Sequence, residues 1–179
     1  GENPRFSADG QRILVNTGGY LFGALDKALV SFDLNGKDRR VHFKSKYANQ
    51  WAPSPDGQWL AFTELHKEYI CAFPKTGQPV DLSADVKSIP VAQVARDAGY
   101  NLHWSGDSKT LHWTLGDEYF STALNRRFAF LAGAPDTLPK MDSVGQKIGL
   151  RLPSDAPEGT VVFENARILT MESDRPLEN

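Results

Sequence analysis

The stretch WAPSPDGQWLAF, residues 51–62, decides the fold of this 179-residue chain, because two looser copies of it occur elsewhere. The copies are PRFSADGQRILV, residues 4–15, and LHWSGDSKTLHW, residues 102–113. Each copy has a serine, a turn that contains an aspartate, a polar residue and then alternating apolar positions. The shared pattern indicates an internal repeat, which constrains the architecture more strongly than any single strand signal.

The spacing of the copies predicts a β-propeller. The three serines, Ser7, Ser54 and Ser105, are 47 and 51 residues apart. A period of this length is typical of one four-stranded propeller blade. The sequence therefore predicts an all-β fold: a partial β-propeller of about two to three four-stranded blades, followed by a short C-terminal β segment.

The intervals between the copies supply the short strands that blades require. After the first copy we expect strands in KALVSFDL and RRVHF, joined by an Asn35-Gly36 hairpin turn, and a fourth strand in NQWAP. After the second copy we expect KEYICAF, QPVDLS and YNLHW, with a helical turn or two compatible with Val91–Gly99. After the third copy we expect EYFSTAL and RFAFLA.

Turn chemistry explains the motif without catalysis. Pro55 fixes φ for the second position of a type I turn, Asp56 can accept hydrogen bonds from nearby amides, and Gly57 tolerates positive φ. The third copy has Ser108 where the others have glycine, so we expect a different turn geometry there. The predicted structural turn residues are Ser7, Asp9, Gly10, Ser54, Pro55, Asp56, Gly57, Ser105 and Asp107.

No catalytic, cofactor-binding or metal site can be assigned from the residues. The four histidines, His42, His66, His103 and His112, form no His-x-His or His-Glu-x-x-His pattern. Glu64, His66 and Glu68 alternate, so in a strand they would share one face and could bind a cation, although a solvated strand edge explains them better. Cys71 lies among apolar neighbours, which favours a buried and unreactive thiol.

Composition limits the classes of partner. A formal net charge of −2 and a pI near 6.1 do not indicate a nucleic-acid binder, and no apolar run is long enough to span a bilayer. No basic-then-apolar leader stands at Gly1, so we expect either a cytoplasmic chain or a mature, trimmed piece, and the absent initiator Met favours the second.

The repeats resemble the TolB-type β-propeller repeat, a relative of the WD-type repeat, whose signature is a Ser-Pro-Asp-Gly turn before an apolar strand. SPDGQWLAF matches this signature closely, SADGQRILV matches it well, and SGDSKTLHW is degenerate. The resemblance covers about Asn3 to Phe130. It implies the fold and leaves the chemistry open.

The C-terminal segment resembles another family. GTVVFENARILTMESDRPLEN, residues 159–179, looks like the opening of the amidohydrolase family of metal-dependent hydrolases. The alternative is a generic β-hairpin that closes the last blade. The resulting domain plan is propeller blades over 1–130, a linker and connecting strand over 131–158, and the start of an amidohydrolase-like β subdomain over 159–179.

These resemblances imply a non-catalytic propeller fragment of a larger amidohydrolase that cleaves C–N bonds with a divalent metal such as zinc. The propeller would cover or gate the active site or mediate interactions. The family's His-x-His pair would come after this segment. Two alternatives remain open: a TolB-like interaction propeller of the cell envelope, and the propeller of a prolyl-oligopeptidase-type serine peptidase, whose Gly-x-Ser-x-Gly elbow is absent here.

A closed propeller usually needs four to eight blades, so we expect the chain to be incomplete, with the leading strand of its first blade missing. The expected partners are the remaining blades and the catalytic domain of the parent. Open blade edges would also invite self-association. Family habit favours a secreted or periplasmic location.

Overall fold

The computed structural model describes residues 1–18, 27–97, 99–153, 156 and 158–178. Contacts within the chain divide it into two units, Gly1–Gly149 and Leu150–Asn179.

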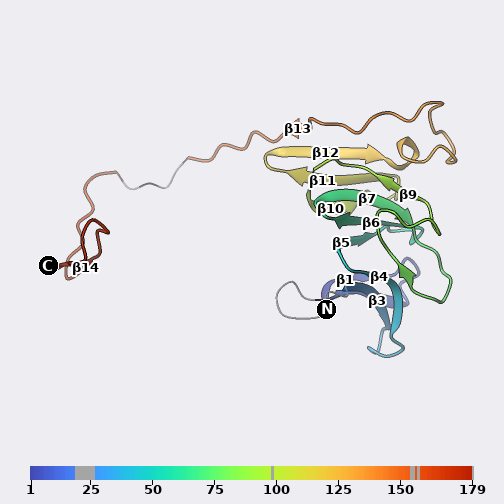
Figure 1. The fold of residues 1–179 in the computed structure, drawn as a ribbon, viewed down its shortest axis with the longest axis horizontal. Helices are drawn as coiled ribbons and strands as arrows, with labels where there is room; N and C mark the ends of the chain where they lie inside the picture. Colours follow the sequence, from blue (N-terminus) through green and yellow to red (C-terminus); the bar gives the residue numbers. More distant parts are fainter. Residues whose placement is uncertain (19–26, 98, 154–155, 157, 179) are drawn as a thin grey trace. The chain divides into compact units, whose positions relative to one another are not determined.

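The described residues of the first unit form three sheets that follow one another along the chain, antiparallel except for one short edge strand (Figure 1). The first sheet contains β1 (Glu2–Phe6), β2 (Arg12–Thr17), β3 (Lys27–Asp33), β4 (Arg40–Ser45) and the short β8 (Val80–Asp81). The second contains β5 (Ala48–Pro53), β6 (Trp59–Glu64), β7 (Lys67–Ala72) and β9 (Val91–Gln93). The third contains β10 (Tyr100–Trp104), β11 (Thr110–Leu115), β12 (Glu118–Ala123) and β13 (Gln146–Lys147).

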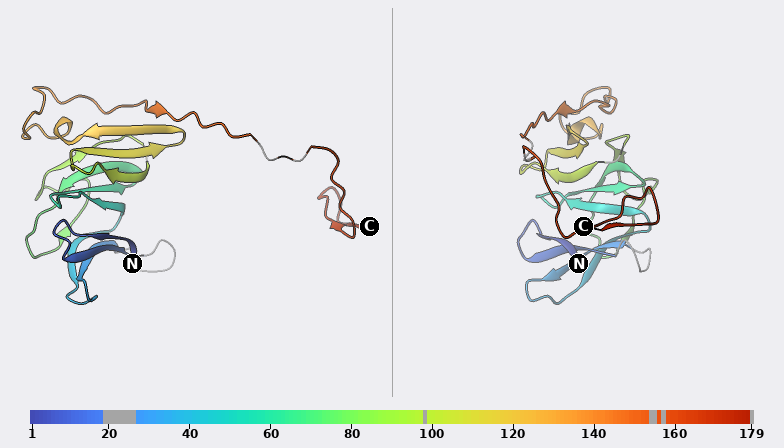
Figure 2. Two further views of the ribbon diagram at one scale, coloured as in Figure 1. Left: turned by 180° about the vertical axis from the view of Figure 1, so that it is seen from behind. Right: turned by 90° about the vertical axis from the view of Figure 1, so that its left-hand side faces the viewer.

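Each sheet therefore begins with an up-and-down run of strands, as a propeller blade does, and the sheets lie one above another in this unit (Figure 2). The described residues contain no α-helix, only a single 3₁₀ turn, η1 (Leu124–Arg126). The predicted all-β, partial-propeller fold class is confirmed, and the sheets are open rather than closed into a ring.

The prediction that the first blade lacks its leading strand is wrong. β1 pairs with β2, with Phe6 opposite Ile13, so the first sheet has its leading strand. The physical reason is that the serine turn is a hairpin turn, which joins the strand before it to the strand after it. For the same reason NQWAP, within β5, opens the second sheet and is not the fourth strand of the first.

The prediction that QPVDLS supplies the next strand of the second blade is also wrong. The strand in QPVDLS, β8, leaves the second sheet and pairs in parallel with β4, where it covers the edge of the first sheet. Its place in the second sheet is taken by β9, which pairs with β7. Residues 91–93 are therefore extended, and the compatible helical turn is not formed there.

The expected strand RFAFLA, residues 127–132, forms turns instead, directly after the 3₁₀ turn η1. Phe128 is buried, and its ring centroid lies 4.9 Å from that of Trp59 in the second sheet. The edge of the third sheet is instead completed by β13, which pairs with β12. Burial of one aromatic ring thus takes precedence over a further run of strand hydrogen bonds.

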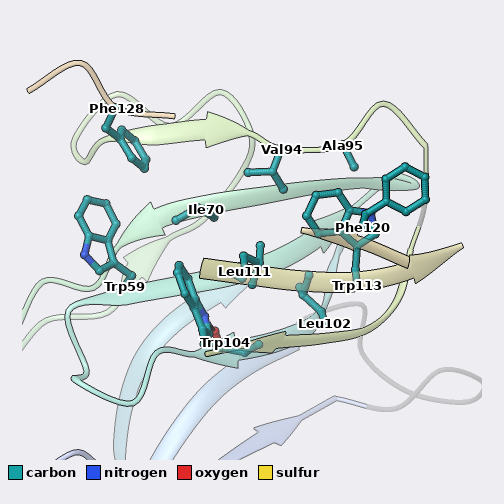
Figure 3. Close-up of a cluster of buried hydrophobic side chains, with 12 residues drawn as sticks. Trp59, Ile70, Val94, Ala95, Leu102, Trp104, Leu111, Trp113, Phe120 and Phe128 are labelled. Atoms are coloured by element: carbon teal, nitrogen blue, oxygen red, sulfur yellow. Dashed lines mark hydrogen bonds between the residues drawn. The ribbon is translucent and has the colours of Figure 1, made fainter. Parts of the chain in front are cut away.

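Two apolar clusters hold the three sheets together. Along β6, Trp59 and Ala61 join the cluster shared with the third sheet, whereas Leu60 and Phe62 join the cluster shared with the first. Side chains of a strand alternate between its two faces, so β6 is buried on both. Figure 3 shows the cluster between the second and third sheets, in which Leu111 and Trp113 of β11 pack with Ile70 of β7.

The second unit has little regular structure. β14 (Arg167–Ile168) pairs with β15 (Leu177–Glu178), and the Arg167 guanidinium donates to the Glu178 carboxylate at 2.6 Å. Several of its apolar side chains are exposed, including Phe163 and Met171. Two short strands leave most of this unit's apolar surface in water.

We predict that Phe128→Ala lowers the free energy of unfolding by about 3–5 kcal/mol, because it removes a buried ring from a packed cluster. Phe130→Ala is the matched control, since Phe130 is 65% exposed and Phe128 only 5%. Urea denaturation of both variants measures the difference. A regular strand would place both rings on one face, so equal losses would contradict the loop structure.

Candidate functional site

The serine turn of the second sheet is held by a compact set of hydrogen bonds. The Ser54 hydroxyl donates to the Asp56 carboxylate at 2.5 Å and accepts from the Trp59 amide at 3.0 Å. The same carboxylate oxygen accepts from the Gln58 amide at 3.0 Å. The Gly57 amide donates to the Ser54 carbonyl at 2.9 Å. The polar side-chain atoms of Ser54 and Asp56 therefore form hydrogen bonds within the turn itself.

The first and third turns repeat this arrangement. Ser7 donates to Asp9, and Ser105 donates to Asp107, each at 2.6 Å. These serine hydrogen bonds, followed by those from backbone amides, lower the pKa of Asp9 and of Asp107. Both groups are thereby favoured as ionised hydrogen-bond acceptors rather than as proton donors.

The prediction that the third turn has a different geometry is wrong. Ser108 adopts φ +61°, close to the φ of +68° and +67° at Gly10 and Gly57, and its amide donates to the Ser105 carbonyl as in the other copies. A polar residue can occupy the left-handed region at a modest cost. The hydrogen-bond pattern, and not glycine itself, is what the repeats share.

Neighbouring turns are also connected. The Ser108 hydroxyl accepts the Asp56 amide at 3.0 Å, and the Trp104 indole donates to the Ala52 carbonyl at 2.9 Å. A Cβ on residue 57 would lie 3.3 Å from the Cβ of Ala8. The turns thus form a row in which the second one contacts both of the others.

A cleft of about 850 Å³ opens beside this row. Its walls come from β1, β2 and β4 of the first sheet, the second serine turn, the loop of residues 73–79 and the end of β10. Its inner wall contains Arg12, whose guanidinium donates to Ser31 Oγ at 2.8 Å and to Asp38 at 2.8 Å. This is the candidate functional site of the chain, and its volume lies in the range of small-molecule sites.

His42 lies in this cleft. Its Nε2 is 2.7 Å from the Ser31 hydroxyl, and its ring meets Phe73 edge-on at 5.4 Å. Burial, and then the charges of Arg12 and Arg40, lower the pKa of His42. Both causes favour the neutral form of the imidazole.

The predicted cation candidate of Glu64, His66 and Glu68 is not one face of a strand. Leu65 and His66 have positive φ and form the hairpin turn between β6 and β7. Glu64 instead accepts from the Ala84 amide at 3.2 Å, and Glu68 is fully buried. Within the described ranges no group of three or more His, Cys, Asp or Glu residues could hold a metal ion.

Glu68 is a buried carboxylate with two donors. Thr63 Oγ1 donates to it at 2.7 Å, and the Gly99 amide donates at 2.8 Å. Burial raises the pKa of Glu68, and these two hydrogen bonds oppose the rise. Its role is to join β6, β7 and the segment that leads into the third sheet.

The remaining candidates are structural or exposed. His103 and His112 face each other across β10 and β11 with ring centroids 5.2 Å apart, and His112 Nδ1 is 2.5 Å from the Tyr119 hydroxyl. Cys71 is fully buried, which raises the pKa of its thiol. A buried thiol of this kind is a poor nucleophile.

Sequence reasoning missed the cleft. Its residues come from segments as distant as Arg5, Lys44 and Lys75, which no local motif connects. The available signal was the run Arg39-Arg40 followed by Lys44, which places several cations on and beside a single strand. Only the pairing of that strand shows where they gather.

No protein-family model and no curated protein matches this chain. Among solved structures, it is similar to the β-propeller domain of the Trilobed protease from Pyrococcus furiosus, with a TM-score of 0.39 and 16% identity over 63% of this chain and 32% of that one. It is also similar to hydrazine synthase from Kuenenia stuttgartiensis, with a TM-score of 0.40 and 15% identity over 68% and 39% of the two chains.

A third similar structure is TolB from Acinetobacter baumannii, with a TM-score of 0.36 and 16% identity over 70% of this chain and 41% of that one. The chain thus spans less than half the length of each of these three structures. In the part of the chain that the structure describes, no helix is both long and apolar enough to cross a membrane.

We predict that Gly57→Ala destabilises the protein by about 1–2 kcal/mol, because an L side chain is strained at φ +67°. Gly106→Ala is the matched control: Gly106 lies in the third turn outside the left-handed region, with no atom within 4 Å of an added Cβ. That variant should be neutral or more stable by up to about 1 kcal/mol. Thermal and urea unfolding measure both, and equal effects would argue against the turn geometry.

We predict that stability falls as pH rises from the ordinary carboxyl pKa to the raised pKa of Glu68. In this window the folded protein holds a proton that the unfolded chain has lost, so deprotonation favours unfolding. Glu68→Gln should flatten the fall in urea unfolding measured from about pH 4 to about pH 8. Glu68→Ala should cost about 1–3 kcal/mol more than Glu68→Gln, because it leaves the Thr63 hydroxyl and Gly99 amide without their acceptor. An unchanged pH profile in Glu68→Gln would refute the assignment.

Proposed function

We propose that this chain is a non-catalytic, TolB-like propeller segment of a larger metal-dependent hydrolase of the amidohydrolase family. In this proposal the blades cover or gate the catalytic domain or carry its interactions. The parent enzyme would hydrolyse amide-like or other C–N bonds.

The observation that carries the non-catalytic role is the hydrogen bonding of the repeated serines and aspartates. In every turn the serine hydroxyl donates to the aspartate, and that aspartate also accepts a backbone amide. A nucleophilic serine needs a general base as its acceptor, and a general acid needs a proton to give. The serine–aspartate pairs stabilise the turns, which is the role expected of them in a structural scaffold.

The hydrolase part of the proposal rests on the sequence of residues 159–179. The exposed apolar side chains of this segment favour the reading, since Val162, Phe163 and Leu169 need a larger core to cover them. In the amidohydrolase reading that core belongs to the small β subdomain that the segment opens.

The metal of such an enzyme would be a divalent ion such as zinc, which lowers the pKa of a bound water and so supplies the nucleophile. The described residues do not fit this role, because they bring together no group of ligands for a metal ion. The ligands would come from the family's His-x-His pair elsewhere in the parent. No step of the reaction is assigned to residues of this chain.

A second candidate is a TolB-like interaction propeller of the cell envelope, which the large cleft beside the turns favours. A peptidase propeller is a third reading of the same repeats. In all these readings we propose a secreted or periplasmic location, which the TolB-like repeats favour, and the remaining blades and catalytic or receptor domain as partners.

The test uses the complete gene product that contains this chain. We expect stoichiometric divalent metal by elemental analysis, hydrolysis of amide or other C–N substrates that chelation abolishes and zinc restores, and neither property in the 179-residue chain alone. His103→Gln should leave the metal content of the complete gene product unchanged, because His103 belongs to the third sheet.

Two results would overturn the hydrolase proposal. Inactivation by a serine-directed reagent, together with a Gly-x-Ser-x-Gly elbow, would identify a peptidase instead. A product with neither metal nor hydrolytic domain would leave the interaction propeller as the function.

A further inference from the structure

The charged residues that line the cleft beside the serine turns are mostly cations. Among the described residues that line it are six cationic side chains and a single carboxylate, Asp9. The whole chain has 20 Lys and Arg against 22 Asp and Glu, so this composition departs from that of the rest. The cations are Arg5, Arg12, Arg39, Arg40, Lys44 and Lys75.

One of these cations, Arg12, lies in the inner wall of the cleft, and the exposed Arg40 shares its carboxylate partner. Arg12 is 15% exposed and pairs with Asp38, which also pairs with Arg40 at 2.6 Å. Arg12 also donates to the fully buried Ser31 hydroxyl, which in turn contacts His42. The Asp38 carboxylate is thus shared by two guanidinium groups. It carries one negative charge, so it neutralises only one of their two positive charges.

Three further cations have no carboxylate counterion among the described residues. Within the described residues, Arg5, Arg39 and Lys44 form no ion pair with a carboxylate. They are exposed and come from β1, from the turn before β4 and from β4 itself. Such unpaired cations around one cleft attract anions, since the walls of a cleft focus the field.

Apolar groups lie among the cations. Phe6, Phe73 and Trp104 line the same cleft, together with prolines of the second serine turn and of the loop of residues 73–79. Concave sites with an apolar surface and a few charged groups are typical of organic ligands rather than of simple ions. Guanidinium groups bind carboxylate and phosphate oxygens through two parallel hydrogen bonds.

We propose that this cleft binds a small organic anion with two or more carboxylate or phosphate groups, held by Arg5, Arg39, Arg40 and Lys44 against the aromatic wall. This site goes beyond the proposed function and does not depend on it, because a scaffold of any of the candidate proteins could carry it.

The test is isothermal titration of the full 179-residue chain at low ionic strength with citrate, with pyrophosphate and with an uncharged polyol. We expect saturable binding of at least one of the two anions, weakened at least tenfold in Arg5→Gln/Arg39→Gln. Neither side chain makes an ion pair within the described residues, so the fold should persist, and circular dichroism checks this. The citrate and pyrophosphate arms distinguish a carboxylate ligand from a phosphate ligand.

Lys67→Gln/Lys87→Gln is the charge-matched control, because both lysines are exposed and neither lines the cleft. Binding that survives in this control and is lost in the cleft variant supports the site. Equal loss in both variants would indicate a general charge effect and overturn the proposal. Absence of binding by both anions would also overturn it, as would equally tight binding of the uncharged polyol.

Discussion

The hydrogen bond between serine and aspartate in each turn is the constraint on which the three sheets depend. It fixes the turn, and the turn fixes the register of the strand that follows, because Ser54 holds Trp59 through both its hydroxyl and its backbone. From that register Trp59 points toward the third sheet and Leu60 toward the first. A slip of one residue would exchange the two faces of β6 and disturb both apolar clusters together.

The middle sheet has the most demanding position. It is covered on both sides, so a polar group inside it must find partners within the protein. Glu68 meets this requirement through Thr63 and the Gly99 amide. Gly99 in turn leaves no room for a side chain, since an added Cβ would lie 2.5 Å from the Trp113 ring. A polar contact and a close backbone approach therefore fix the passage from the second sheet to the third.

The sequence predicted what local chemistry determines. The repeat, the three serine turns and the strands next to them follow from turn residues and alternation, and the structure has them. The assignments that were wrong depend on distant partners. The strand in QPVDLS joins the edge of another sheet. RFAFLA forms no strand, and its Phe128 packs against Trp59 of the second sheet. The cleft was missed for the same reason, because Arg5 and Lys44 come to line one cleft only through the order of the strands. Resemblance of residues 159–179 to a hydrolase opening remains a prediction.

The parallel pairing of β8 with β4 changes how the protein should come apart. In an array of repeats each unit usually touches only its neighbours through side-chain packing, and an end unit can fray while the others stay folded. Here a strand that the second repeat contributes is hydrogen-bonded into the first sheet, with Phe43 opposite Val80. The first sheet cannot peel away without breaking main-chain bonds to the next repeat. Cooperativity between blades thus comes from backbone hydrogen bonds as well as from packing of the apolar core.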